Sequence, residues 1–184
     1  GIVVGKPGTA TVSIKELEQV IEKEHTKLKS LDELKEIRAD LKRKGRKVAF
    51  TSGCYDILHP GHIGLLKKAR SYGDVLVLAM NSDKSSFFKT KGDDRPILNE
   101  DERIRVLSGL ESIDYITTFD EDTPLKIIKE LKPDVKIKGG TYIKERVSEE
   151  DDFIRSYGGV AKYIDMIEDF STTKLINKIR NRGD

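Results

Sequence analysis

Short apolar runs alternate along this chain with segments whose apolar residues recur every three or four positions. The runs predict β-strands, and the longer spacing predicts amphipathic helices. Val75–Met80 is apolar throughout, as expected for a strand that is buried on both faces of a parallel sheet. The predicted strands are Val48–Thr51, Val75–Met80, Tyr115–Phe119, Val135–Lys138 and Ala161–Met166. The predicted helices are His62–Tyr72, Glu100–Leu110, Pro124–Leu131 with Thr123 as its cap, Glu149–Tyr157 and Thr172–Arg180.

Five strands separated by helices predict an α/β fold, a Rossmann-like doubly wound five-stranded parallel sheet. Ligands of such sheets bind outside the carboxyl ends of the strands, where the strand order reverses. The residues of this chain that are best suited to chemistry follow predicted strands, so we expect the functional site at that edge.

A helical extension precedes this predicted domain. Apolar residues in Ile14–Leu28 fall at helical spacing, and Ser30–Glu33 forms a capping box for a second helix that ends at Gly45. Residues 1–11 are a short apolar stretch broken by Gly and Pro, typical of a fragment of a larger unit or of an arm that packs elsewhere. We therefore predict a possible remnant of a preceding domain at 1–11, a helical linker at 12–46 and the main domain at 47–184.

The composition limits the class of protein further. The chain has 184 residues, and its 34 Lys+Arg and 32 Asp+Glu nearly cancel to a formal charge of +2. Such a balance gives no sign of nucleic-acid binding. Cys54 is the single cysteine, which excludes an intramolecular disulfide. Without a secretory leader or an apolar run of membrane-spanning length, the sequence predicts a cytoplasmic protein without a membrane partner.

The strongest chemical signal is the segment Thr51–His62, which begins at the end of the first predicted strand and finishes in the first turn of a helix. A helix N-terminus offers free N–H groups and a positive partial charge, and both favour a phosphate. Pro60 removes no donor that the helix needs, and Gly61 lets a polyphosphate approach the backbone. Because His59 and His62 add two imidazole donors, the segment predicts a polyphosphate site.

Three other interpretations of this segment are open. The two histidines could have met by chance, with one of them capping the helix. A zinc site would use both histidines, but the sequence offers no clear third ligand. Cys54 could act as a nucleophile, although a lone buried cysteine is more often a small apolar filler.

With its His-x-Gly-His motif at this place, the chain resembles the cytidylyltransferase-like nucleotidyltransferase superfamily over about Val48 to Arg180. The resemblance implies a direct displacement, in which a substrate phosphate attacks the α-phosphorus of a nucleoside triphosphate and pyrophosphate leaves. His59 and His62 would stabilise the charge on the phosphates, without a covalent enzyme intermediate. Positioning and electrostatics supply most of the catalysis in such transfers.

Three later segments also match the superfamily. Lys89 and Lys91 follow the second strand and would be cations for the triphosphate and the acceptor phosphate, whereas an isolated pair of this kind is usually a solvated loop. Paired glycines after the fourth strand allow close backbone approach, and Tyr142 would pack against a base unless the segment is a plain turn. The hydroxyls of Ser171–Thr173 open the last helix and form a second anion site or a simple N-cap.

The resemblance completes the predicted site. It gives Arg103 a phosphate contact, with a surface ion pair as the alternative, and it makes Asp56 the candidate for orienting the acceptor or a metal-bound water, with a structural cap as the alternative. The predicted catalytic residues are His59, His62 and Lys91. The predicted nucleotide-binding residues are Ser52, Gly53, Tyr55, Gly61, Lys89, Gly139, Gly140, Tyr142, Ser171, Thr172 and Thr173, and the predicted substrate-binding residues are Asp56 and Arg103.

Within the superfamily, Asp94–Ile97, Glu121–Pro124 and Lys138–Gly140 resemble the heptose 1-phosphate adenylyltransferases. Residues 1–11 are similar to the last segment of the ribokinase-like domain that precedes this domain in bifunctional enzymes of that group. The chain departs from the pattern of the group at four positions: Ser52 replaces Asn, Tyr55 replaces Phe, Thr141 replaces an acid and Asp169 replaces Gly.

The resemblance therefore implies an enzyme that makes ADP-D-glycero-β-D-manno-heptose from ATP and a sugar 1-phosphate, for lipopolysaccharide or another surface glycan. Mg²⁺ is expected with the triphosphate, since the sequence shows no carboxylate cluster for a dedicated metal site. The expected partners are a covalently preceding kinase domain and, as an open question, a second copy in a homodimer. The alternatives are a cytidylyltransferase for a small alcohol phosphate such as glycerol 3-phosphate, and a non-catalytic ATP-sensing domain.

Overall fold

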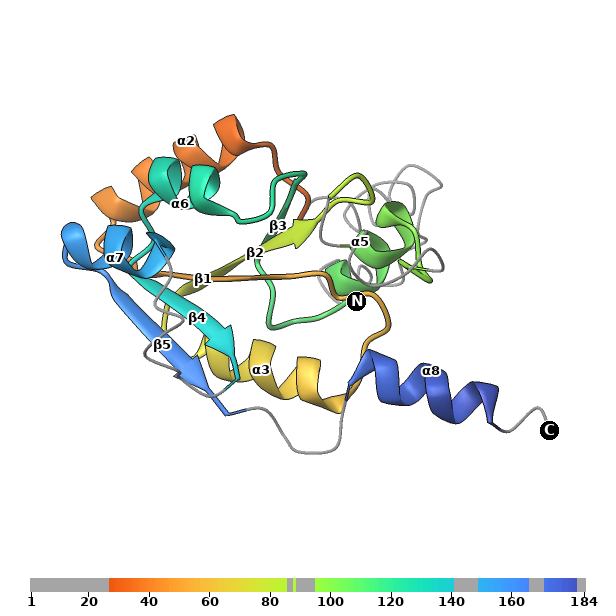
Figure 1. The fold of residues 1–184 in the computed structure, drawn as a ribbon. Helices are drawn as coiled ribbons and strands as arrows, with labels where there is room; N and C mark the ends of the chain where they lie inside the picture. Colours follow the sequence, from red (N-terminus) through yellow and green to blue (C-terminus); the bar gives the residue numbers. More distant parts are fainter. Residues whose placement is uncertain (1–26, 86–87, 89–94, 141–148, 166–170, 182–184) are drawn as a thin grey trace, which may run out of the picture.

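The computed structural model describes residues 27–85, 88, 95–140, 149–165 and 171–181. Its five strands form a sheet in the order β3-β2-β1-β4-β5, with parallel pairing throughout (Figure 1). This confirms the predicted doubly wound parallel sheet. The strands are β1 (Val48–Gly53), β2 (Val75–Asn81), β3 (Tyr115–Phe119), β4 (Val135–Gly139) and β5 (Val160–Ile164). The helices are α2 (Leu31–Arg43), α3 (Pro60–Arg70), α5 (Glu100–Ser108), α6 (Leu125–Leu131), α7 (Glu149–Ser156) and α8 (Thr172–Arg180).

The strand order reverses at β1, in the middle of the sheet. From β1 the chain winds outward through β2 to β3, and it then returns to the other side of β1 for β4 and β5. Thr51 pairs with Ile137, and two residues further on the neighbouring strands end at Gly53 and Gly139. This shared edge is the switch point at which ligands of such sheets bind.

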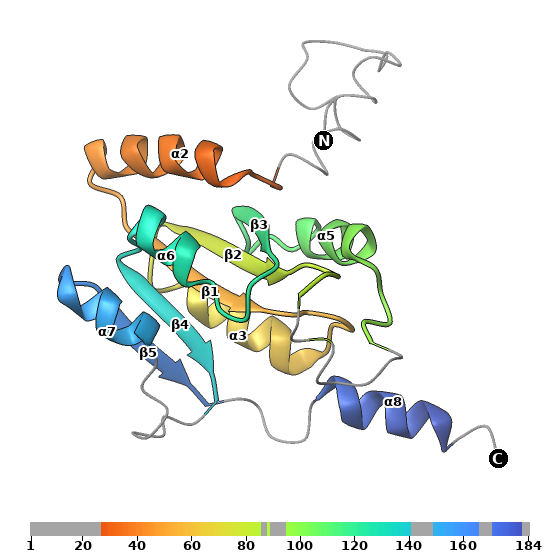
Figure 2. The same cartoon turned by 45° about the horizontal axis from the view of Figure 1, so that its top comes forward.

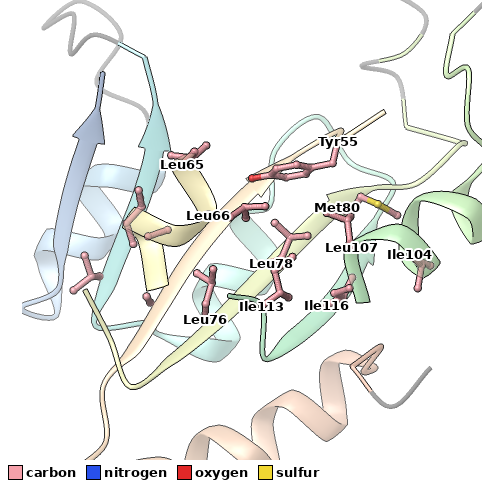
Figure 3. Packing of buried hydrophobic residues seen from close by; sticks show 14 residues of the cluster. Tyr55, Leu65, Leu66, Leu76, Leu78, Met80, Ile104, Leu107, Ile113 and Ile116 are labelled. Carbon is pink, nitrogen blue, oxygen red and sulfur yellow. The ribbon is translucent and has the colours of Figure 1, made fainter. Parts of the chain in front are cut away.

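Helices cover both faces of the sheet (Figure 1, Figure 2). α3 and α5 pack on one face, where Leu66, Leu78 and Leu107 belong to one buried cluster (Figure 3). α2, α6 and α7 pack on the other face, where Phe50 and Ile128 belong to a second buried cluster. Each fully buried side chain of this size contributes on the order of 1.5–3 kcal/mol through the hydrophobic effect. The two clusters therefore fix the sheet from both sides.

Helix α2 belongs to this packed core, although it precedes the first strand. Its predicted capping box is confirmed, since the Glu33 N–H donates to the Ser30 hydroxyl at 3.3 Å and the Ser30 N–H donates to the Glu33 carboxylate at 2.8 Å. Leu34 is 0% exposed and Leu41 is 5% exposed, and both lie in the same cluster as Phe50. The apolar face of α2 is thus buried against the domain.

The segment before α2 differs from the prediction. Leu28 does not continue a helix but forms a parallel bridge with Ile116 of β3. The Lys29 N–H donates to the Ile116 carbonyl at 2.8 Å, and the Ile116 N–H donates to the Lys27 carbonyl at 2.7 Å. The edge of β3 needs partners for its backbone groups, and this requirement overrides the helical spacing around Leu28. Residues 1–11 and the rest of the predicted first helix lie outside the described residues.

Three other boundaries also depart from the prediction. Pro124, rather than Thr123, is the N-cap of α6, and no side chain caps this helix. Helix α3 begins at Pro60, because a proline at the first helical position has no N–H to satisfy. Strand β5 ends at Ile164 instead of Met166, because it pairs with the short strand β4, whose last residue Gly139 faces Ile164.

Leu34→Ala should lower the free energy of unfolding by about 2–5 kcal/mol, because it leaves a cavity beneath a fully buried helix face. Glu36→Ala, on the exposed side of the same helix, is the matched control and should change it by less than about 0.5 kcal/mol. Urea unfolding followed by circular dichroism measures both. Equally small effects would show that α2 is not part of the folding unit.

Candidate active site

Both histidines of the central motif lie where β1 gives way to α3. His59 is the N-cap of α3 in extended conformation, but its imidazole makes no capping hydrogen bond. His62 lies in the first turn, and the two rings stack with centroids 3.8 Å apart and an interplanar angle of 22°. The first turn of α3, which is described in full, contains no acidic residue. The predicted pair is therefore brought together at a helix N-terminus that is open to an anion.

The electrostatics of this pair favour neutral rings. Burial lowers the pKa of His59. Burial and the neighbouring His59 lower the pKa of His62 to about 4, although a hydrogen bond with the backbone of Ile57 acts in the opposite direction. The Nδ1 atom of each ring is buried without a hydrogen-bond partner in the described part of the chain. Buried polar atoms of this kind call for a partner, and a ligand can supply one.

Helix α8 brings a second N-terminus to the same place. Ser171 caps α8 by accepting the Lys174 N–H at 3.1 Å, and the Thr172 hydroxyl donates to the Ile57 carbonyl at 3.4 Å. A cavity of about 300 Å³ lies between the starts of α3 and α8. Its lining residues are Leu58, His59, Pro60, Ser171, Lys174, Leu175 and Lys178. The two predicted anion sites therefore border one cavity, and the capping interpretation holds for Ser171 at the same time.

Lys174 and Lys178 are candidate site residues that the sequence analysis did not identify. They lie one turn apart on α8 and line the cavity beside His59. Their spacing of four residues was visible in the sequence and places them on one face of a helix. Only the position of α8 next to α3 shows that this face meets the histidine pair.

The ends of β1 and β4 lie at the switch point, as predicted. Ser52 and Gly53 are half-buried at the end of β1, and Gly139 ends β4. Gly140 follows with φ +113°, and its N–H donates to the Ile164 carbonyl at 2.8 Å. A Cβ atom at Gly140 would meet no protein atom within 4 Å, so within the protein it is the backbone conformation that favours glycine here. Close approach of the backbone to a nucleotide stays a prediction.

Asp56 is used within the protein scaffold. Its side chain is buried, and one oxygen accepts the Arg95 Nε–H at 2.6 Å. The other oxygen accepts the N–H groups of Ile97 and Leu98 at 2.9 and 3.0 Å. These contacts support the structural-cap alternative, because the carboxylate holds the segment before α5. Contact with the acceptor substrate stays a prediction.

Arg103 is also part of the scaffold, and it is not the surface residue that the ion-pair alternative supposed. Its residue exposure is 1%, and its guanidinium donates to the carbonyls of Cys54, Asn81 and Leu98 at 2.7, 2.8 and 3.1 Å. It also donates to Asp83 at 2.5 Å. These bonds already occupy most of the donors of the guanidinium. Phosphate contact by Arg103 stays a prediction.

Several other assignments stay predictions. Lys89, Lys91 and Tyr142 lie outside the described residues. The Cys54 thiol is 3.4 Å from the Asn81 side-chain oxygen, at the end of β2. Across the described ranges, no group of three or more His, Cys, Asp or Glu side chains could hold a metal ion. Within the same ranges, no helix is long and apolar enough to cross a membrane.

The low pKa of His62 predicts how stability depends on pH. An unperturbed histidine has a pKa of about 6.5, so between about pH 6.5 and pH 4 the unfolded state binds more protons at this position than the folded state. The free energy of unfolding should therefore fall as the pH falls through this window. His62→Gln should make the decrease shallower, because it removes this proton uptake. Denaturant unfolding at a series of pH values measures both slopes, and parallel curves would contradict the prediction.

Comparison with known proteins places the chain in a family. The family model described as cytidylyltransferase-like matches residues 50–178. "Bifunctional protein HldE" of Geobacter metallireducens is 47% identical over 183 residues, which cover 97% of this chain and 37% of that protein. The protein of the same name from Syntrophotalea carbinolica is 44% identical over 186 residues, which cover 99% of this chain and 38% of that protein. The chain thus spans less than two fifths of the length of these relatives.

A solved structure agrees with the family match. The "lipopolysaccharide core biosynthesis protein from Thermoplasma volcanium GSS1" is 29% identical, with a TM-score of 0.53, and the match covers 67% of this chain and 98% of that one. The matched residues include the turn between β1 and α3, both histidines and the start of α8. The chain belongs to the cytidylyltransferase-like family.

Proposed function

We propose that this chain is the adenylyltransferase part of a bifunctional protein, which transfers the adenylyl group of ATP to D-glycero-β-D-manno-heptose 1-phosphate. The products are ADP-heptose and pyrophosphate. The observation that carries the proposal is the cavity between the N-termini of α3 and α8, which is lined by His59, the residue on which His62 stacks. Two helix N-termini with no acid in their first turns suit a polyphosphate.

The choice of acceptor is supported by the relatives. Two of them are named bifunctional and are 44–47% identical over nearly the whole chain, and a third carries lipopolysaccharide core biosynthesis in its title. Because the chain spans only 37–38% of those two relatives, we infer a second domain elsewhere in the full-length protein, namely the sugar kinase that the resemblance implies. The product would then serve lipopolysaccharide or another surface glycan, in the cytoplasm.

In the proposed reaction, an oxygen of the sugar phosphate attacks the α-phosphorus of ATP. The new P–O bond forms as the bond to the bridging oxygen between the α- and β-phosphorus breaks, and pyrophosphate leaves. His59 and His62 donate to the phosphate oxygens on which negative charge grows. Their contribution is largest in the transition state because they are held in place before the substrate arrives. Lys174 and Lys178 are placed to neutralise the departing pyrophosphate.

Mg²⁺ fits this scheme as a companion of ATP. Asp56 is committed to Arg95 and two backbone N–H groups, and the described residues offer no cluster of metal ligands. The triphosphate itself would therefore carry the ion, as is usual for Mg²⁺ at nucleotide sites. Bound in this way, Mg²⁺ would neutralise charge on the leaving pyrophosphate.

His59→Ala and His62→Ala should each lower kcat on the order of 10²–10³-fold, because each removes a donor aimed at transition-state charge. Pyrophosphate release from ATP and heptose 1-phosphate measures the rate. Thermal melts show whether each variant is folded. A folded variant with kcat near that of the unchanged protein would refute the assignment.

The alternatives are separated by crossing four nucleoside triphosphates with a panel of sugar and polyol phosphates. Release of pyrophosphate from ATP only with the heptose phosphate is the expected result. Turnover of CTP with glycerol 3-phosphate would instead indicate the cytidylyltransferase. ATP binding without turnover on any acceptor would indicate a sensor.

Replacing both Thr172 and Thr173 with Val should weaken ATP binding or slow transfer about tenfold or more, because two hydroxyl donors are lost beside the cavity while shape is kept. Stability should change little, since Thr173 is exposed and the Thr172 bond to Ile57 is long. Asn177→Ala, on the exposed surface of α8, is the control. Calorimetric titration measures the ATP affinity, and thermal melts measure stability. A lower melting temperature with unchanged ATP affinity and turnover would contradict a role of the two hydroxyls in phosphate binding.

A further inference from the structure

The turn between β1 and α3 contains a residue in an unusual conformation. Tyr55 has φ +48°, in the left-handed region that bulky side chains rarely occupy. Its side chain is 4% exposed and belongs to the core cluster beneath α3 (Figure 3). The Tyr55 ring therefore packs into the core of the protein.

The end of β1 is shaped to receive this ring. A Cβ atom at Gly53 would lie 3.0 Å from Cε2 of Tyr55 and 3.5 Å from two further ring atoms. A contact at 3.0 Å is tighter than ordinary packing, so a side chain here would require the ring to shift by a few tenths of an ångström. The absence of a side chain at Gly53 is thus what lets the Tyr55 ring lie against the strand end.

The same ring also contacts the histidine pair. The centroids of Tyr55 and His62 are 5.1 Å apart, with the planes tilted by 49°, and His62 in turn stacks on His59 at 3.8 Å. Three rings therefore follow one another from the core to the start of α3. Aromatic rings at these separations are attracted to one another, and packing of this kind restricts their orientation.

We propose that Tyr55 is a positioning residue, whose ring rests on Gly53 and holds His62, and through it His59, in the orientation that meets the phosphates. The inference rests on the proposed function, because it concerns how that site is held in place. It differs from the predicted role of Tyr55 and Gly53 in nucleotide binding. The ring carries the role, and the hydroxyl does not.

Two features of the Tyr55 hydroxyl support a role for the ring rather than for the hydroxyl. The hydroxyls of Tyr55 and Thr51 are neighbours in the core, yet neither completes a well-formed hydrogen bond among the described residues. Burial raises the pKa of Tyr55 to about 12, which Thr51 only partly offsets. Removing a poorly bonded hydroxyl costs little.

The ring also shields His62 from water. Burial has the largest effect on the pKa of His62, followed by His59 and a hydrogen bond with the backbone of Ile57. The Tyr55 ring, 5.1 Å away, is one of the groups that bury His62. Without the flat ring, water would reach His62, and its pKa would rise from about 4 towards the ordinary value near 6.5. This gives a measurement that a residue with a purely structural role would not move.

The test compares Tyr55→Leu with the conservative variant Tyr55→Phe. In Tyr55→Leu we expect the imidazole titration of His62, followed by NMR, to shift upward by at least one pH unit and kcat to fall at least tenfold, while the KM for ATP changes less. In Tyr55→Phe both quantities should stay close to those of the unchanged protein. The chain has three histidines, so His62→Gln assigns the signal.

Each outcome decides the proposal. An unshifted His62 titration together with an unchanged kcat in folded Tyr55→Leu would overturn it, as would a raised KM for ATP in Tyr55→Phe, which would indicate nucleotide contact. If Tyr55→Leu does not fold, Gly53→Ala displaces the same ring by adding only a methyl group, and it should shift the same titration upward. The titration needs no substrate, so failure of the proposed function would leave this result readable.

Discussion

Backbone carbonyls at the carboxyl ends of the central strands need partners, and Arg103 is the group that supplies them. At the ends of β1 and β2, the carbonyls of Cys54 and Asn81 no longer pair with a neighbouring strand. Both accept hydrogen bonds from the Arg103 guanidinium. Buried carbonyls without a partner are costly. The same side chain binds the Leu98 carbonyl and Asp83, so it fastens α5 to both strand ends. This charged group therefore ties together the strand ends at the switch-point edge of the sheet.

This arrangement distinguishes polar side chains that are bonded within the protein from polar atoms that lack a partner in the described ranges. Arg103 and Asp56 spend their hydrogen bonds on the loops around the site, whereas the Nδ1 atoms of His59 and His62 have no partner in the described ranges. On the other side of β1, buried Lys136 of β4 pairs with Asp151 at 2.7 Å and with Glu150, which anchors the start of α7. Tyr163 of β5 donates to Asp151 at 2.5 Å. Charged groups thus fix the elements on both sides of the switch point.

A fixed frame has a direct benefit for transfer between phosphates. In such a transfer the protein forms no covalent bond with the substrate. Most of the rate enhancement comes from charges and dipoles that are held where negative charge grows in the transition state. Burial lowers the pKa of both stacked histidines and so favours their neutral forms, and their hydrogen bonds to a phosphate would form in partly buried surroundings. Hydrogen bonds are stronger there than in water, provided that every other buried polar group is satisfied.

The sequence by itself determined the fold class, the strands and the histidine pair, because each rests on a local pattern. A run such as Val75–Met80 has few alternatives to a buried strand, and a helix that begins at Pro60, directly after His59, presents its N–H groups whatever surrounds it. Only the tertiary structure decided which charged residues are inside, since the hydrogen bonds of Arg103 and Asp56 join segments that lie far apart in the chain. It also decided that Leu28 pairs with β3 and that one face of α8 meets His59. Those contacts join residues far apart in the chain, and no local spacing encodes them.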